Sequence, residues 1–137
     1  YEKLIEQICK VVSDTLPAHA TVVVVSKGDD NLIDLGGRQG WHFPQNEDGA
    51  YAGYYPHDSA QVIAHLEALR EKGGEFLLLP STALWWLDHY AEFNQYLEQK
   101  YPVVFRQNDV CVIFALSKSE RQAQRLSKES EGPAVTG

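Results

Sequence analysis

The sequence predicts an α/β fold: a three-layer, Rossmann-like domain with a mostly parallel sheet and a C-terminal antiparallel hairpin. The β-branched run at residues 21–26 has no polar alternation, which is typical of a strand covered on both faces. Further along the chain, helix-like periodicity alternates with short apolar runs. The last two runs, 103–107 and 110–116, flank Asn108 and Asp109, which predicts a hairpin with a two-residue turn.

The first half of the chain supplies one helix, one strand and a long glycine-rich segment. A helix is expected over residues 2–16, where apolar side chains recur at the spacing of one helix face, and Pro17 ends it. The β-branched strand follows. Residues 27–57 are expected to be mainly loop, with short strands at 32–33 and 41–43.

Start and stop signals in the sequence predict a second helix. It begins after Asp58, whose carboxylate can cap it, and Gln61 stands three residues later as in a capping box. Gly73 and Gly74 end this helix. The short apolar run at 76–79 is then expected to be a buried strand.

Two more helices are expected between this strand and the hairpin. Ser81 can cap a short third helix that includes residues 85–87. A fourth helix is expected from about residue 90 to residue 100. Because the end of the chain is polar, we expect residues 1–116 to form the α/β domain and 117–137 to form a linker or disordered tail.

Composition excludes several classes of function. The 137 residues fit one compact domain, and 12 Lys and Arg against 19 Asp and Glu give a net charge of −7. This acidic balance, without a basic cluster, argues against nucleic acid as a partner. No apolar run reaches the roughly 18 residues that a membrane span needs.

The cysteines and the first residue give two further expectations. Cys9 and Cys111 lie in apolar periodic segments, so we expect buried free thiols and, from them, a cytoplasmic location. The chain begins at Tyr1 without Met, so we expect it to be a piece of a longer protein. No spacing of His, Cys and carboxylates fits a zinc site, and no metal is expected.

The candidate site lies at the carboxyl ends of the parallel strands, where ligands bind in open α/β sheets. Helix starts at Ser59 and Thr82 would add backbone N–H donors suited to an anion. Aromatic residues in the 41–59 segment suit stacking on sugar rings or contact with another domain, and packing of this loop over the sheet is the alternative. The candidate ligand-binding residues on this rim are Lys27, Asp29, His42, Tyr54, Tyr55, Asp58, Ser59, Ser81 and Trp85.

One glycine motif offers a competing interpretation. Residues 34–40, Asp-Leu-Gly-Gly-Arg-Gln-Gly, resemble the glycine loop of methyltransferases that use S-adenosylmethionine, with Arg38 in place of a glycine. Such a loop follows a strong strand and opens a helix, but here the strong strand ends earlier and Pro44 follows, so we expect these glycines to serve turns. The chain has neither a Gly-x-Ser-x-Gly elbow nor a phosphate-cradling glycine loop, so nucleophilic catalysis has no support in the sequence.

Four stretches together resemble a domain that recurs in large bacterial glycosyltransferases, beside catalytic modules for cell-surface polysaccharide synthesis. They are Val-Val-Ser-Lys-Gly-Asp-Asp at 24–30, Trp-His-Phe-Pro at 41–44, Asp-Gly-Ala-Tyr-Ala-Gly-Tyr-Tyr-Pro at 48–56 and Leu-Pro-Ser-Thr-Ala-Leu-Trp-Trp-Leu-Asp-His-Tyr at 79–90. The likeness covers about residues 2–116. The resemblance implies an accessory α/β domain to which no catalytic residues are assigned, with the polar tail leading to the next domain.

These observations give one main expectation and two alternatives. We expect an accessory domain, not itself an enzyme, that binds a sugar, a nucleotide-sugar or a neighbouring domain at the strand-end rim. The first alternative is a small transferase that uses S-adenosylmethionine or a nucleotide-sugar. The second is a scaffold whose aromatic loop is buried in a contact between domains.

Overall fold

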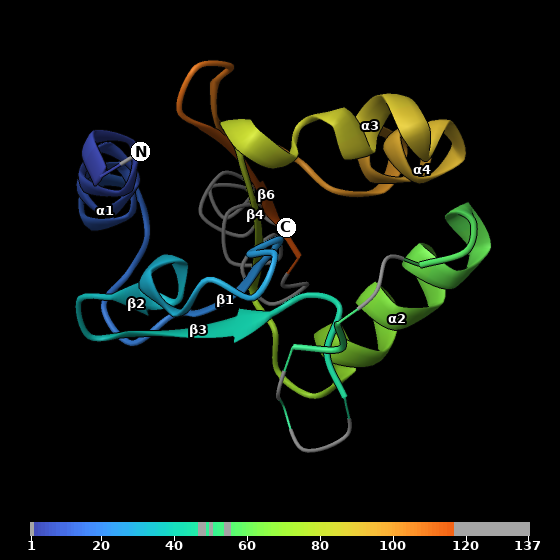
Figure 1. Ribbon diagram of the computed structural model, residues 1–137, viewed down its shortest axis with the longest axis horizontal. Helices are drawn as coiled ribbons and strands as arrows, with labels where there is room; N and C mark the ends of the chain where they lie inside the picture. The colour runs from blue at the N-terminus through green and yellow to red at the C-terminus, as the bar shows by residue number, and fades with distance from the viewer. Residues whose placement is uncertain (1, 47–48, 50, 54–55, 117–137) are drawn as a thin grey trace, which may run out of the picture.

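The computed structural model describes residues 2–46, 49, 51–53 and 56–116. Within these residues the chain forms one six-stranded sheet and four α-helices, an α/β fold (Figure 1). None of the helices in these ranges is long and apolar enough to cross a membrane. The expected tail at 117–137 lies outside the described residues.

The sheet is mixed, whereas the sequence predicted a mostly parallel one. Its order is β2-β3-β1-β4-β6-β5. β1 pairs in parallel with β3 and β4, and the other three pairs are antiparallel. Two hairpins account for the antiparallel pairs. In the first, β2 folds back on β3. The second is the expected C-terminal hairpin of β5 and β6, and its strand β6 also pairs with β4. The strands are β1 Thr21–Val24, β2 Asp34–Leu35, β3 Arg38–His42, β4 Phe76–Pro80, β5 Val103–Gln107 and β6 Cys111–Ala115.

The helices lie on both sides of the sheet (Figure 1). α1, at the N-terminus, stands on one side, and α2, α3 and α4 stand together on the other. Two short 3₁₀ helices, η1 and η2, follow β1 and β4. The bounds are α1 Glu2–Thr15, η1 Asp30–Leu32, α2 Ser59–Glu71, η2 Ser81–Ala83, α3 Trp85–His89 and α4 Ala91–Lys100.

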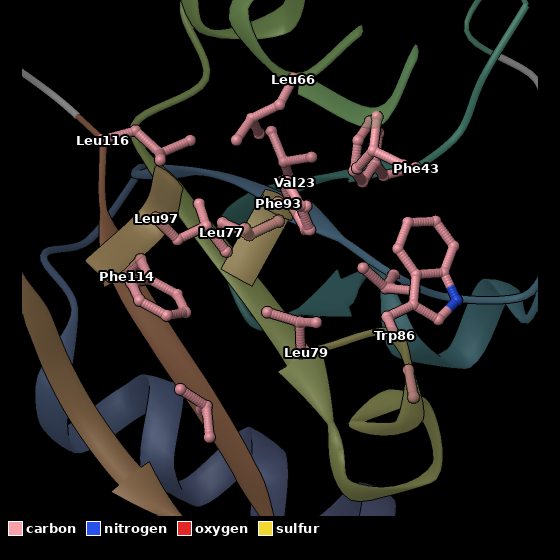
Figure 2. Packing of buried hydrophobic residues seen from close by; sticks show 14 of the residues in the cluster. Val23, Phe43, Leu66, Leu77, Leu79, Trp86, Phe93, Leu97, Phe114 and Leu116 are labelled. Carbon is pink, nitrogen blue, oxygen red and sulfur yellow. The ribbon is translucent and has the colours of Figure 1, made fainter. Parts of the chain in front are cut away.

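Alternate residues of β1 enter two separate hydrophobic clusters. Val23 faces α2, α3 and α4 and shares a cluster with Leu77 of β4 (Figure 2). Val22 and Val24 face the other way, in a second cluster with Val12 of α1. The predicted double burial of this strand is therefore confirmed, and it explains why the run has no polar alternation.

Four local expectations differ from the structure. Residues 32–33 are not a strand, because Asp29 accepts a hydrogen bond from the Asn31 N–H at 2.9 Å and starts η1 there. The strand expected at 41–43 begins earlier, at Arg38. Ser81 caps no helix with its side chain, and its N–H donates to Val110 O at 2.8 Å. The hairpin turn has three residues, because Gln107 pairs with Cys111.

Both cysteines are free, as expected, but their burial differs. Cys111 is fully buried, and burial raises the pKa of its thiol to about 12. Cys9 is only half-buried, and burial together with the nearby Asp34 carboxylate raises its pKa. Both thiols are therefore held in their less reactive, protonated form at neutral pH.

Candidate functional site

A strained turn leaves the carboxyl end of β1. The Asp29 N–H donates to Ser26 O at 3.0 Å, which closes a β-turn around Lys27 and Gly28. Both central residues have left-handed backbone angles, with φ of 54° at Lys27 and 84° at Gly28. Glycine adopts this conformation freely, but a lysine there costs roughly 1–2 kcal/mol. The turn therefore holds an exposed lysine in a conformation that disfavours it.

A chain of hydrogen bonds links this turn to the end of β3. Ser26 Oγ lies 2.5 Å from His42 Nδ1, and His42 Nε2 lies 2.9 Å from Asp30 Oδ1. Ser26 is 1% exposed and His42 is 7% exposed, whereas 88% of the Asp30 side chain is exposed. Parallel pairing of β1 and β3 brings Val24 level with His42, and this is what places the three side chains together.

The hydrogen bonds determine which ring nitrogen of His42 carries the proton. Ser26 Oγ already accepts the Gly28 N–H at 3.2 Å, so its own hydrogen is free to be donated to Nδ1. Nδ1 is then the acceptor, and Nε2–H donates to the Asp30 carboxylate. The network therefore runs in one direction, from the buried serine outward to an exposed aspartate.

Tyr51 covers the inner part of this network. Its ring stands edge-on to the His42 ring, with 6.1 Å between the centroids. A Cβ atom added at Gly28 would lie 2.9 Å from Tyr51 Cδ2, so the tyrosine ring rests on the glycine backbone. Gln45, on the same segment, donates from Nε2 to His42 O at 2.9 Å. With Tyr51 and Gln45 packed beside it, the Ser26–His42 pair is almost fully buried.

Serine, histidine and aspartate are also the residue types of a nucleophilic triad. In that arrangement the ring nitrogen Nε2 takes the proton of an accessible serine, and Nδ1–H is held by the aspartate. Here Nδ1 faces the serine, Nε2 faces the aspartate, and the serine is buried. The geometry therefore suits fixing Asp30 in place better than attack by Ser26 on a substrate.

The residues expected on one rim are divided between the two faces of the sheet. Lys27, Asp29 and His42 lie at the β1 and β3 ends, on or beside the Ser26 network. His42 is level with Val24, which belongs to the α1 cluster, whereas the next residue, Phe43, belongs to the cluster of α2, α3 and α4. Successive residues of a strand point to opposite faces, so the strand ends separate the two groups. The second group comprises Asp58, Ser59, Ser81 and Trp85.

The start of α2 is capped by the chain itself. Asp58 Oδ1 accepts the Gln61 N–H at 3.0 Å, as the capping signal predicted. Gln61 Oε1 in turn accepts the His57 N–H at 2.6 Å, one residue earlier than in a standard capping box. Ser59 is buried. The Asp58 carboxylate thus caps α2, and it occupies the position that an anionic ligand would take at this helix start.

Trp85 lies on the face opposite to His42. It is 37% exposed, while the adjacent Trp86 is fully buried. Edge-to-face contacts brace the Trp85 ring against Trp86 at 6.1 Å and His89 at 5.8 Å between centroids. Trp86 also lies 5.7 Å from Phe43, which fixes α3 over the end of β3 (Figure 2). The start expected at Thr82 lies within the three-residue η2, not an α-helix.

Two of the candidate residues, Tyr54 and Tyr55, lie outside the described residues.

Sequence reasoning missed two members of the Ser26–His42–Asp30 network. Ser26 and Asp30 were not among the candidate residues, although both flank candidates. The signal that would find them is the parallel pairing of β1 with β3, which joins residues 16 and 12 positions apart along the chain.

A pocket and the metal-ligating side chains also bear on ligand chemistry. A pocket of about 420 Å³ opens at the amino edge of β3, lined by His19, Gly37, Arg38 and Gln39. It is away from the Ser26 network, and the Arg38 guanidinium there donates to Leu16 O and Gly36 O at 2.9 and 3.0 Å. Within the described ranges, no group of three His, Cys, Asp or Glu side chains is placed to hold a metal ion.

The glycines of the methyltransferase-like motif form a hairpin. Gly36 and Gly37, with φ of 59° and 87°, make the two-residue turn between β2 and β3.

Comparison of this chain with protein-family models, curated proteins and solved structures gives no match. The geometry of the site and the residues that form it therefore carry the information on function.

Proposed function

We propose that this chain is an accessory binding domain, not itself an enzyme, of a larger cytoplasmic bacterial glycosyltransferase. Its ligand is a sugar, a nucleotide-sugar or a neighbouring domain. The site is the β1–β3 edge, defined as Ser26, Lys27, Asp29, Asp30 and His42. The resemblance of the sequence supplies the glycosyltransferase context. The Rossmann-like interpretation of the fold belongs to the same proposal, since β1, β3 and β4 run in parallel with α2 as a crossover.

One observation carries the proposal: two costly local features meet at the same strand edge. Burial of the polar Ser26 and His42 side chains carries a desolvation cost, and the left-handed Lys27 costs the fold free energy where glycine or asparagine would form the same turn more cheaply. Local features that oppose stability are expected mainly at functional sites. Binding is favoured over catalysis because Ser26 is only 1% exposed, and within the Ser26–His42–Asp30 network the strongly exposed group is Asp30.

Use of S-adenosylmethionine has less support. The glycines on which that alternative rests are taken up by the β2–β3 hairpin turn. Gly40, the last of them, lies inside β3, where an added Cβ would be 2.4 Å from Ile33 O. These positions therefore have structural reasons to be glycine that involve no cofactor.

A thermal-shift series tests the proposal. The chain is heated with oligosaccharides, nucleotide-sugars and S-adenosylmethionine, and a ligand at about 100 times its dissociation constant stabilises the fold by roughly 2.7 kcal/mol. We expect a sugar or nucleotide-sugar to raise the melting temperature, and Lys27→Ala to reduce the shift. Lys10→Ala is the matched control, because Lys10 lies on α1 and pairs with Asp14. A response to S-adenosylmethionine alone, or equal shifts in both variants, would contradict the proposal.

A further inference from the structure

We infer that Ser26 and His42 are positioning residues that hold Asp30 as the acceptor for ligand hydroxyl groups, and that the ligand of the β1–β3 edge is an uncharged sugar. This inference rests on the proposed function and narrows its ligand. It follows from three properties of the edge: the exposure and fixed orientation of Asp30, the buried Ser26–His42 pair that supports it, and the negative local charge.

Asp30 combines exposure with a fixed orientation. Its Oδ1 is held by His42 Nε2 at 2.9 Å, while 88% of the side chain remains exposed. An exposed aspartate normally samples several rotamers, and ordering it costs entropy when a ligand binds. Here the rotamer is already selected, and Oδ2, for which no protein partner is found among the described residues, faces solvent. A fixed carboxylate oxygen of this kind accepts hydrogen bonds from hydroxyl groups, which are the groups a sugar presents.

The network behind Asp30 is more elaborate than a surface carboxylate requires. Water satisfies an exposed aspartate at no cost, so stability alone gives no reason to bury a hydroxyl and an imidazole beneath it. The Ser26 hydroxyl orients the His42 ring, and the ring orients Asp30. Support of this kind, in which a buried partner fixes the tautomer and direction of an outer group, is how proteins preorganise binding groups.

The charge of the edge selects against a phosphorylated ligand. Asp29 and Asp30 are adjacent, and Lys27 is the single cation of the 26–30 turn. The whole chain carries −7. A diphosphate would bring further negative charge to this edge, where Asp29 and Asp30 already stand side by side. Hydroxyl groups of an uncharged sugar meet no such repulsion and can donate to the Asp30 carboxylate.

The test measures binding of defined probes to the intact chain by isothermal titration calorimetry. The probes are maltotetraose, cellotetraose and chitotetraose as uncharged sugars, and UDP-glucose as the phosphorylated alternative. We expect an uncharged sugar to bind, and Asp30→Asn to weaken it by about 10- to 100-fold, the value of one hydrogen bond to a charged group. Asn keeps an acceptor for His42 Nε2, so the variant folds. Asp14→Asn is the control, because it removes the same negative charge from an exposed position on α1, and we expect it to leave the affinity unchanged.

Two substitutions of His42 separate positioning from a merely structural role. In His42→Gln the amide nitrogen lies near the place of Nε2 and can still donate to Asp30. In His42→Asn the shorter amide reaches the Ser26 side but not Asp30. We expect Gln to retain most of the affinity and Asn to lose about as much as Asp30→Asn does. A structural role alone would change the melting temperatures and leave the affinities of the two folded variants equal.

Each outcome distinguishes the two proposals. An uncharged sugar that binds equally well to Asp30→Asn overturns this inference and leaves the proposed function standing. UDP-glucose that binds while the uncharged sugars do not also overturns it, and again keeps the proposed function. If neither kind of probe binds, the proposed sugar and nucleotide-sugar ligands fail, and this inference fails with them.

Discussion

Lys27 shows at the scale of one residue how the turn after β1 departs from the most stable solution. Its φ of 54° lies in the left-handed region, which asparagine tolerates better than lysine. We predict that Lys27→Asn stabilises the chain by about 0.5–1 kcal/mol, measured as a higher midpoint of urea unfolding. Lys72→Asn is the control, because Lys72 has an ordinary helical φ of −77° and gains nothing. Destabilisation by Lys27→Asn would mean that the lysine side chain itself supports the fold.

Gly40 is a glycine for reasons of space. A Cβ there would lie 2.4 Å from Ile33 O and 2.6 Å from Ile33 Cα, and backbone atoms of this kind have no alternative rotamer. We predict that Gly40→Ala destabilises the chain by about 3 kcal/mol, at the upper end of the range for overpacked sites, as measured by thermal unfolding.

The comparison for this prediction is Gly36→Ala in the hairpin turn. Gly36 has a φ of 59° but open space around its Cα, so only the backbone penalty of about 1–2 kcal/mol applies. Equal effects of the two substitutions would show that Ile33 moves aside at little cost. In the sequence these two glycines look alike, and only the packing of Ile33 against β3 distinguishes their roles.

Glu67 joins two helices, which is a property of elements rather than of single residues. Its Oε2 accepts the Tyr101 hydroxyl at 2.5 Å, just beyond α4, and its Oε1 accepts Arg70 Nε at 2.7 Å within α2. Burial alone raises the pKa of this carboxyl, but the hydrogen bonds from Tyr101 and Arg70 outweigh burial, so its pKa lies below the usual 4.5. The lowered pKa ties the docking of α2 against α4 to pH.

The sign of this dependence follows from the direction of the shift. A carboxyl with a lowered folded-state pKa stabilises the fold fully above its usual value of 4.5, and the contribution is lost as pH falls through the folded pKa. We predict that Glu67→Gln lowers the free energy of unfolding by about 1–2 kcal/mol at pH 7, and that the difference from the unsubstituted chain shrinks near pH 3. Urea unfolding at both pH values measures it. Glu71→Gln, at an exposed position of the same helix, is the control, and equal pH dependence in both variants would refute the assignment.

Elements with strong local signals could be predicted from the sequence, and short ones could not. The residues around α1, α2, α4, β1 and β4 carry complete periodic or apolar runs with clear stop signals, and these elements are where the sequence placed them. The pair at 32–33 is too short for its period to be read, and the Asp29 side chain started a 3₁₀ turn instead. β2 has only two residues, and it pairs with β3 because the Gly36–Gly37 turn reverses the chain between them.

At the scale of the whole molecule, the sheet decides which candidate residues meet. The sequence indicated the carboxyl edge correctly for Lys27, Asp29 and His42. It could not show that α2, α3 and α4 cover the face of Phe43 and not that of His42, which separates Trp85 and Asp58 from the other candidates. The Ser26–His42–Asp30 network depends on the parallel pairing of two strands and leaves no local pattern in the sequence.

A titration followed by two-dimensional ¹H–¹⁵N NMR of the intact chain tests most directly whether a sugar binds at the β1–β3 edge. Uncharged oligosaccharides and UDP-glucose are added in turn, and the backbone amide shifts are mapped on the fold. We predict that a bound sugar shifts the amides of residues 26–30 and 42–43, at the carboxyl ends of β1 and β3. Shifts confined to His19 and residues 37–39, around the pocket at the opposite edge, would contradict it, as would no shift with any of these probes.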